Sequence, residues 1–181
     1  MPDAAPSVEP SPVPARPPVR TSHHWAAFFA LAGGIVVADQ VVKQWVTATV
    51  AYGTRMAVVG DYVRIEPVQN SGALFGLFGN QAYLFAALSI GVVGLIVWFH
   101  GRSVVTNGWF ATLALGLLLG GAVGNLADRL RLGYVVDFVN MGVGDLRFYT
   151  YNVADAAISA ALVLLILMAF WPSPRRRWIA G

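Results

Sequence analysis

Long apolar runs alternate with short polar stretches along most of the chain, and this pattern predicts four membrane-spanning helices. The runs cover Trp25 to Val46, Ala82 to Phe99, Trp109 to Ala127 and Val153 to Trp171. A helix rises about 1.5 Å per residue, so about 20 residues cross a hydrocarbon core of roughly 30 Å. The first run is wholly apolar only as far as Ala38, so its polar last part should lie near one membrane interface.

Two segments outside these runs alternate between apolar and polar residues with a period of two, which predicts β-strands. The first is Val63 to Val68, where Pro67 predicts an edge strand because proline cannot donate to a ladder. The second is Leu146 to Tyr151. We expect the two strands to pair into a small sheet beside the membrane. The predicted fold class is therefore a mainly α, polytopic membrane protein with four transmembrane helices and a small extramembrane β-sheet.

Composition supports this fold class and sets the two ends of the chain apart. Of all residues 57% are hydrophobic and 12% are charged, whereas a soluble domain is about 25% charged. Seven of the ten prolines precede Ser22, a composition typical of disorder. We therefore expect a disordered Pro-rich tail over 1–22, a four-helix membrane domain over 23–174 and a basic tail over 175–181.

An even number of spans places both ends of the chain on one side of the membrane. The two tails and the 100–108 loop carry six arginines, and the opposite side carries five. Cytoplasmic segments are enriched in Lys and Arg, so this count and the cluster at Arg175 to Arg177 favour cytoplasmic tails. The sheet then lies on the outer side.

Charged and amide side chains gather at the sheet side of the spans, whichever way the protein is inserted. Charges this close to apolar runs are costly, so they usually serve a function in a protein interior or a wet cavity. Asn125, Asp128 and Arg129 are related by i+3 and i+4 spacing and share a helix face. The predicted cluster comprises Asp39, Lys43, Asn70, Asn125, Asp128, Asp137, Asn152 and Asp155.

Two helices carry spacings that predict specific contacts. Asp39 and Lys43 are four residues apart in the favourable acid-first order, although this spacing taken alone favours a snorkelling pair at the interface. In the third span Gly116, Gly120 and Gly124 form a stripe of small residues, which allows a neighbouring helix to approach closely.

The residue types in the cluster limit its chemistry. The chain has no cysteine, and His23, His24 and His100 lie on the side opposite the acids, so no Cys or Ser–His nucleophile and no zinc site is expected. A carboxylate-bound magnesium ion stays possible but would suit a phosphate substrate. Two carboxylates in a partly dry site can share one proton, so that one activates a water while the other hydrogen-bonds a carbonyl. Such a pair hydrolyses amides.

The residues alone leave three hypotheses open: a protease, a proton- or ion-coupled small membrane transporter, and a structural membrane assembly protein. Acids within a membrane mark transport pathways, but the sequence shows no inverted repeat and no acid in mid-span. A structural role explains the glycine stripe but not acids and amides gathered at one depth. The scattered basic residues and the net charge of +3 argue against a nucleic-acid partner.

Five motifs together resemble those of the lipoprotein signal peptidases, also called signal peptidase II. Each motif alone is weakly specific, but all five occur in the family's order between Trp25 and Trp171. Tyr151 stands where many members have Phe. The motifs are Asp39-Gln-Val-Val-Lys43, Asn70-Ser-Gly-Ala-Leu-Phe75, Gly120-Gly-Ala-Val-Gly-Asn-Leu-Ala-Asp-Arg129, Val136-Asp-Phe138 and Asn152-Val-Ala-Asp155.

The resemblance implies an aspartic endopeptidase of the bacterial cytoplasmic (inner) membrane, with 23–174 as its peptidase domain. Its extramembrane segments would form the small β-sheet and a flap on the outer side, which hold the substrate. Its substrates would be diacylglyceryl-modified prolipoproteins, cut before the lipidated cysteine. Its partners would be these substrates and membrane lipids, and it would act as a monomer without a metal or cofactor. The implied catalytic residues are Asp137 and Asp155. The implied substrate-binding and supporting residues are Asp39, Lys43, Asn70, Gly72, Asn125, Asp128, Arg129 and Asn152.

Overall fold

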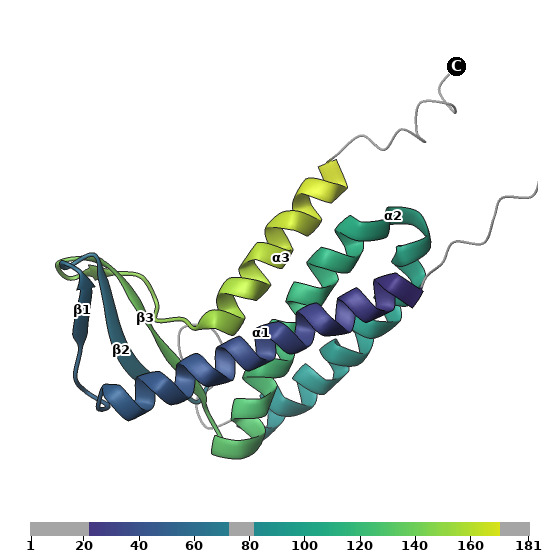
Figure 1. Cartoon of the computed structure of the whole chain (residues 1–181). Coiled ribbons are helices and arrows are strands. Elements are labelled where there is room, and N and C mark those ends of the chain that lie inside the picture. Colours follow the sequence, from purple (N-terminus) through teal and green to yellow (C-terminus); the bar gives the residue numbers. More distant parts are fainter. Residues whose placement is uncertain (1–21, 73–81, 171–181) are drawn as a thin grey trace, which may run out of the picture.

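Helices packed side by side, with a small sheet projecting from one end, make up the described part of the protein (Figure 1). The computed structural model describes residues 22–72 and 82–170, so the two predicted tails and the last part of the motif that begins at Asn70 lie outside the described residues. The elements in chain order are α1 (Ser22–Thr49), β1 (Met56–Val59), β2 (Val63–Asn70), α2 (Ala82–Leu132), β3 (Val135–Val143), β4 (Leu146–Arg147) and α3 (Val153–Phe170).

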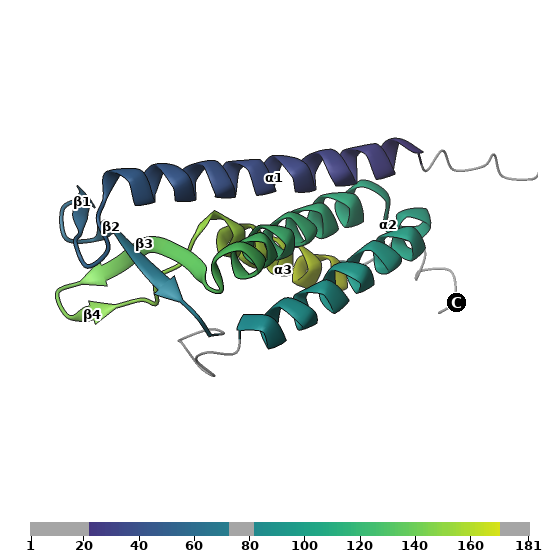
Figure 2. The same ribbon diagram turned by 90° about the horizontal axis from the view of Figure 1, so that it is seen from below.

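The four predicted spans are confirmed, with shifted ends. Helices long and apolar enough to cross a membrane cover Ser22–Thr49, Tyr83–Ser103, Gly108–Leu132 and Val153–Phe170. The second and third are the two halves of α2, which doubles back at Gly108, where φ is 56° and ψ is −130° (Figure 2). Such a φ is accessible mainly to glycine. The predicted loop between these spans is therefore a break within a nearly continuous helical segment.

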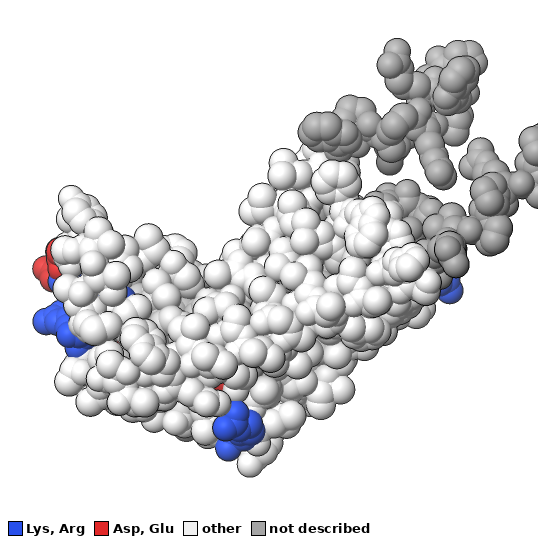
Figure 3. Space-filling view, in the orientation of Figure 1, with Lys and Arg blue, Asp and Glu red and all other residues white. Residues whose placement is uncertain are grey.

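Apolar side chains cover the outside of the helices. Figure 3 shows uncharged residues over the visible face of the helices, with charged residues near their ends and on the sheet. Large apolar side chains such as Leu88, Leu95 and Leu167 are more than half exposed. Apolar patches of this extent rarely face water. A hydrocarbon environment explains them, so the chain is a multi-pass membrane protein.

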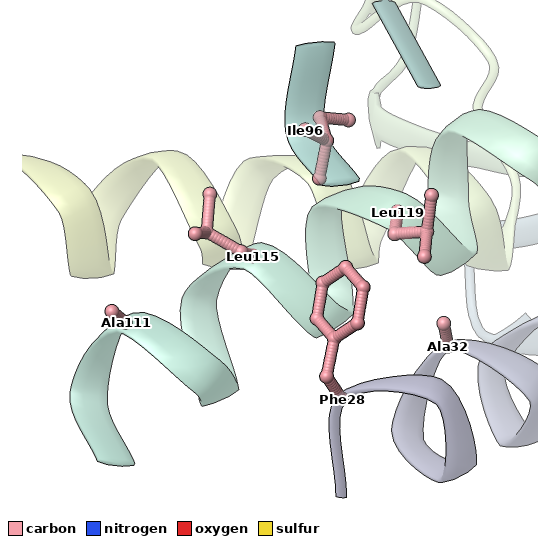
Figure 4. Packing of buried hydrophobic residues seen from close by; sticks show 6 residues of the cluster. All are labelled: Phe28, Ala32, Ile96, Ala111, Leu115 and Leu119. Carbon is pink, nitrogen blue, oxygen red and sulfur yellow. The ribbon is translucent and has the colours of Figure 1, made fainter. Parts of the chain in front are cut away.

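One buried apolar cluster joins α1 to both halves of α2. Figure 4 shows its side chains pointing toward one another from these helices. Close packing of this kind supplies the attraction between helices in a bilayer, where water does not drive them together. The cluster consists of Phe28, Ala32, Ile96, Ala111, Leu115 and Leu119.

The predicted glycine stripe is the surface on which α1 and α2 meet. A Cβ atom at Gly120 would lie 2.7 Å from the Ile35 Cβ and 2.9 Å from the Ala32 carbonyl oxygen. A Cβ atom at Gly124 would lie 2.9 Å from Asp39 Oδ2. The absence of side chains at these glycines therefore brings Asp39 directly against α2.

The sheet is antiparallel with the order β1-β2-β3-β4, so β2 is an internal strand and the predicted edge position of Pro67 is wrong. The register of β2 against β3 shifts between Ile65 and Val68. At such an irregularity a residue needs no ladder bond, which is the other place where a strand tolerates proline.

The predicted pairing of the two sequence-derived strands is also wrong, because β3 lies between them. The second predicted strand is reduced to β4, and Tyr151 forms only an isolated bridge with Val139. The first four residues of β3 are all buried, so this strand has no polar–apolar alternation to reveal it. Its pairing with β2 places Asp137 opposite Val68 and Val135 opposite Asn70.

Candidate active site

Asp137 and Asp155 line one cavity of about 910 Å³ at the junction of the helices and the sheet. Asp137 is the third residue of β3, and Asp155 lies in the first turn of α3. Asn70, Asn125 and Arg129 also line this cavity. Its other walls are largely apolar and include Phe85, Leu88, Val92, Val135, Ile158 and Leu162.

Asp155 is held by a reciprocal cap at the start of α3. Asn152 Oδ1 accepts the Asp155 N–H at 2.9 Å, and Asp155 Oδ2 accepts the Asn152 N–H at 3.2 Å. This capping box satisfies N–H groups that the helix leaves free, and the positive end of the helix dipole favours a carboxylate. The local sequence Asn152-Val-Ala-Asp155 therefore fixes the carboxylate at the end of the helix.

Asp137 is held by two amide side chains. Asn152 Nδ2 donates to Asp137 Oδ1 at 2.7 Å, and Asn70 Nδ2 donates to Asp137 Oδ2 at 2.9 Å. Asn70 is itself fixed because the Gly72 N–H donates to Asn70 Oδ1 at 3.1 Å. The pairing of β2 with β3 thus supplies a donor for this carboxylate.

Asn125 and Asn152 connect the two carboxylates. Asn125 Nδ2 donates to Asp155 Oδ1 at 2.8 Å, and Asn152 Nδ2 lies 3.1 Å from Asn125 Oδ1. All four oxygens of Asp137 and Asp155 therefore accept an N–H. Among the described residues, the ion pairs of the protein lie elsewhere and include neither of these acids.

Burial, and to a smaller extent the negative charge of Asp155, raise the pKa of Asp137 to about 7. The hydrogen bonds from Asn70 and Asn152 and the positive charge of Lys43 oppose this rise. A carboxyl group with a pKa near neutrality holds a proton at working pH, beside a second acid that can accept one. Such a pair is suited to general acid–base catalysis.

The Lys43 cluster, formed by Asp39, Lys43 and Asp128, lies next to these two acids. Lys43 Nζ is 2.7 Å from Asp39 Oδ2 and 2.8 Å from Asp128 Oδ2, and it donates to Asn125 Oδ1 at 3.2 Å. Lys43 is only 3% exposed. The interpretation of Asp39 and Lys43 as a snorkelling interfacial pair is therefore wrong, because the ammonium group points into the protein and has three acceptors.

Arg129 contacts the backbone near the end of β2 rather than an acid. Its Nη2 lies 3.4 Å from the Gly72 carbonyl oxygen, and its Nη1 lies 3.4 Å from the Asn125 carbonyl oxygen. The guanidinium carbon lies 5.7 Å from the centre of the Phe85 ring. Arg129 thus ties the Gly72 segment to α2 at the wall of the cavity.

Two residues of this region were not singled out from the sequence. Gln40 Nε2 donates to Asp128 Oδ1 at 2.8 Å and lies 3.2 Å from Asp39 Oδ2. Its place beside Asp39 within a motif is the signal that could have found it. Tyr149 lines the main cavity and also a second one of about 690 Å³ that reaches Asp155. No sequence signal distinguishes Tyr149 from the neighbouring aromatic residues.

The sequence is similar to a known protein family over most of its length. The family model described as signal peptidase (SPase) II matches residues 31–171. The lipoprotein signal peptidase of Hydrogenovibrio crunogenus is 38% identical over 148 residues, which cover 78% of this chain and 83% of the relative. The lipoprotein signal peptidase of Geobacillus kaustophilus is 32% identical over 151 residues, which cover 83% of this chain and 97% of the relative.

The fold is similar to solved structures of bacterial membrane enzymes. One, determined by the in meso method at 2.3 Å resolution, has a TM-score of 0.71 and 26% sequence identity, and the match covers 80% of this chain and 87% of that chain. Another, determined by the same method at 1.9 Å resolution, has a TM-score of 0.71 and 25% identity, with 82% and 95% covered.

Proposed function

The chain belongs to the signal peptidase II family, and on this basis we propose that it hydrolyses its substrate by an aspartic mechanism with Asp137 and Asp155 as the catalytic pair. Its function is the removal of signal peptides from prolipoproteins, and the transporter hypothesis is not favoured. The observation that carries the catalytic proposal is that two acids from separate elements line one cavity, each with both oxygens bound by N–H donors.

The geometry suggests a division of roles between the two acids. Asp155 accepts a proton from a water, which then attacks the carbonyl carbon of the scissile peptide bond. Asp137, which holds a proton at neutral pH, donates it toward the carbonyl oxygen as the tetrahedral intermediate forms. The proton taken by Asp155 is then delivered to the leaving amine as the C–N bond breaks, and the intermediate's hydroxyl returns its proton to Asp137.

The supporting residues have distinct tasks in this proposal. Asn70, Asn125 and Asn152 orient the carboxylates, whereas Arg129 holds the Gly72 segment at the wall of the cavity. The apolar part of the cavity suits a substrate whose diacylglyceryl group stays in the bilayer while the bond before the lipidated cysteine reaches the acids. Burial of acyl chains contributes about 0.8 kcal/mol per CH₂.

The proposed orientation keeps both tails in the cytoplasm and the catalytic pair near the outer face of the bacterial inner membrane. The arginine count of six against five and the basic segment after α3 support it. We also propose that the peptidase domain covers 23–174, acts as a monomer and uses neither a metal nor a cofactor.

Replacing either catalytic acid by Asn should abolish cleavage without unfolding the protein. Asparagine keeps the shape of aspartate but cannot carry the shared proton, so Asp137→Asn and Asp155→Asn should each lower turnover by at least ~10² to 10⁴-fold. Ionised Asp137 is unfavourable in the folded state above its raised pKa of about 7. Asp137→Asn should therefore hold or raise the melting temperature at about pH 8.

The assay is release of the signal peptide from a purified diacylglyceryl prolipoprotein by detergent-solubilised enzyme. Asp145→Asn is the matched control, because Asp145 is exposed in the turn between β3 and β4. Asp61 is a poorer control, since its carboxylate accepts the Gly144 N–H and pairs with Arg64. Near-normal turnover by a folded Asp137→Asn or Asp155→Asn enzyme would refute the catalytic assignment.

A further inference from the structure

Each proposed catalytic acid directly follows a residue whose backbone N–H is bound by a buried carboxylate. The Ala154 N–H donates to Asp39 Oδ1 at 3.0 Å, one residue before Asp155. The Val136 N–H donates to Asp128 Oδ2 at 3.1 Å, one residue before Asp137. A carboxylate from another element therefore hydrogen-bonds the backbone N–H of the residue just before each of the two acids.

Lys43 joins the two carboxylates that make these contacts. Its ammonium group lies 2.7 Å from Asp39 and 2.8 Å from Asp128, and both acids are almost fully buried. Its third partner is Asn125, which donates to Asp155. One cation on α1 thus connects the backbone before Asp155, the backbone before Asp137 and an amide that orients one of the acids.

We propose that Lys43 is a positioning residue for the reaction: it holds Asp39 and Asp128 where they fix the backbone before Asp155 and Asp137, and so sets the spacing of the catalytic pair. This inference rests on the proposed function of that pair. It assigns Lys43 no contact with the substrate and no part in proton transfer.

Electrostatics explains why a cation is needed at this point. An ionised carboxylate accepts a backbone N–H more strongly than a neutral oxygen does. Two buried carboxylates without a cation between them would repel each other or take up protons. The Lys43 ammonium group lies between Asp39 and Asp128, offsets their mutual repulsion and holds the two carboxylates close together. A displacement of reacting groups by about 1 Å can lower the rate about 10²-fold, so a small shift of either acid should affect catalysis.

The main test compares Lys43→Met with the unaltered enzyme on a diacylglyceryl prolipoprotein in detergent micelles. Methionine keeps most of the length of lysine but has no charge. We expect kcat to fall about 10²-fold while KM changes less than about threefold, because positioning affects the reaction more than substrate binding. Unchanged kcat and pH dependence in folded Lys43→Met enzyme would overturn the proposal.

A pH profile separates positioning from a merely structural role. The charge of Lys43 lowers the pKa of Asp137 toward its ordinary value, so removing the charge raises this pKa. The protonated form of Asp137 then persists to higher pH. The residual activity of the Lys43→Met enzyme should therefore fall at a higher pH than the activity of the unaltered enzyme. If Lys43 only stabilised the fold, its replacement would lower the melting temperature and leave the alkaline fall in activity at its original pH.

Asp128→Asn covers the case in which Lys43→Met does not fold. The variant retains an oxygen for the Val136 N–H but loses the charge that pairs with Lys43, so kcat should fall with little change in KM. A normal kcat in folded Asp128→Asn enzyme would then overturn the proposal. The control is His100→Phe, because His100 is fully buried and stacks on Phe28 near the start of α1. This control should lower stability and leave kcat unchanged.

The two proposals fail in different ways. If Asp137→Asn or Asp155→Asn retains activity, the catalytic assignment is wrong, whatever Lys43→Met does. If both aspartate variants are inactive and Lys43→Met keeps the kcat of the unaltered enzyme, only the positioning role is wrong.

Discussion

Asparagine side chains, rather than cations, donate hydrogen bonds to the carboxylates of the proposed catalytic pair. Asn70 and Asn152 donate to Asp137, and Asn125 donates to Asp155. An amide offers N–H donors without a full positive charge. Lys or Arg in the same places would lower the pKa of Asp137 and remove the proton that the pair shares. The amides therefore fix the geometry and keep general acid–base chemistry available near neutral pH.

Turnover should fall as the pH rises above about 7. Burial and the charge of Asp155 raise the pKa of Asp137 to about 7, so the proton that Asp137 donates is lost across this range. The measurement is kcat and kcat/KM from about pH 5 to about pH 9, with melting temperatures recorded in parallel. A rate that stays constant up to about pH 9 would contradict the role of Asp137 as proton donor.

The helices could be predicted from the sequence because the thickness of a bilayer sets their length, whereas the strands could be predicted only in part. β3 escaped prediction because its first residues are buried on both faces. Pro67 led to the wrong prediction of an edge strand, because proline is tolerated at a register irregularity as well as at a sheet edge. Motif resemblance pointed to residues that the structure brings together around one cavity. Spacing could not show that Lys43 points inward, because i,i+4 spacing fits both directions.

Packing of α1 on α2 should be sensitive to a single methyl group. Gly120→Ala places a Cβ 2.7 Å from the Ile35 Cβ and 2.9 Å from a backbone oxygen, so it should lower the free energy of unfolding by roughly 1–3 kcal/mol. The matched control is Gly94→Ala, in the first half of α2, where a Cβ meets no atom within 4 Å. This control should be neutral or stabilising by up to ~1 kcal/mol. Equal melting temperatures for the two variants would contradict the packing described here.

At the scale of the whole molecule, the proposed catalytic pair lies where a membrane helix bundle meets a sheet. α3 and β3 each supply one acid, and α1 and α2 together supply the Lys43 cluster, in which Asp39 of α1 contacts α3 and Asp128 of α2 contacts β3. The visible face of the helices is uncharged, and charged residues appear near the helix ends and on the sheet (Figure 3). A substrate can therefore keep its apolar part in the bilayer while its scissile bond reaches the acids.

The proposed orientation predicts which single cysteines an impermeant thiol reagent can reach in intact cells. The chain has no cysteine, so each introduced one reports alone. Thr54 is exposed just before β1, so Thr54→Cys should react with the reagent in intact cells. Arg102→Cys, exposed near the end of the first half of α2, should react only after the membrane is opened. Labelling of the two positions in the reverse order would show the opposite insertion.

The inward direction of Lys43 has a consequence for chemical modification. Lys43 is the single lysine of the chain, and its amine lies between two carboxylates with 3% of the residue exposed. An acylating reagent must reach the amine, and this one is shielded from solvent and paired with two carboxylates. The folded protein therefore has no reactive lysine side chain, and acylation of Lys43, measured by mass spectrometry, reports the fraction of molecules that have opened around the proposed catalytic pair.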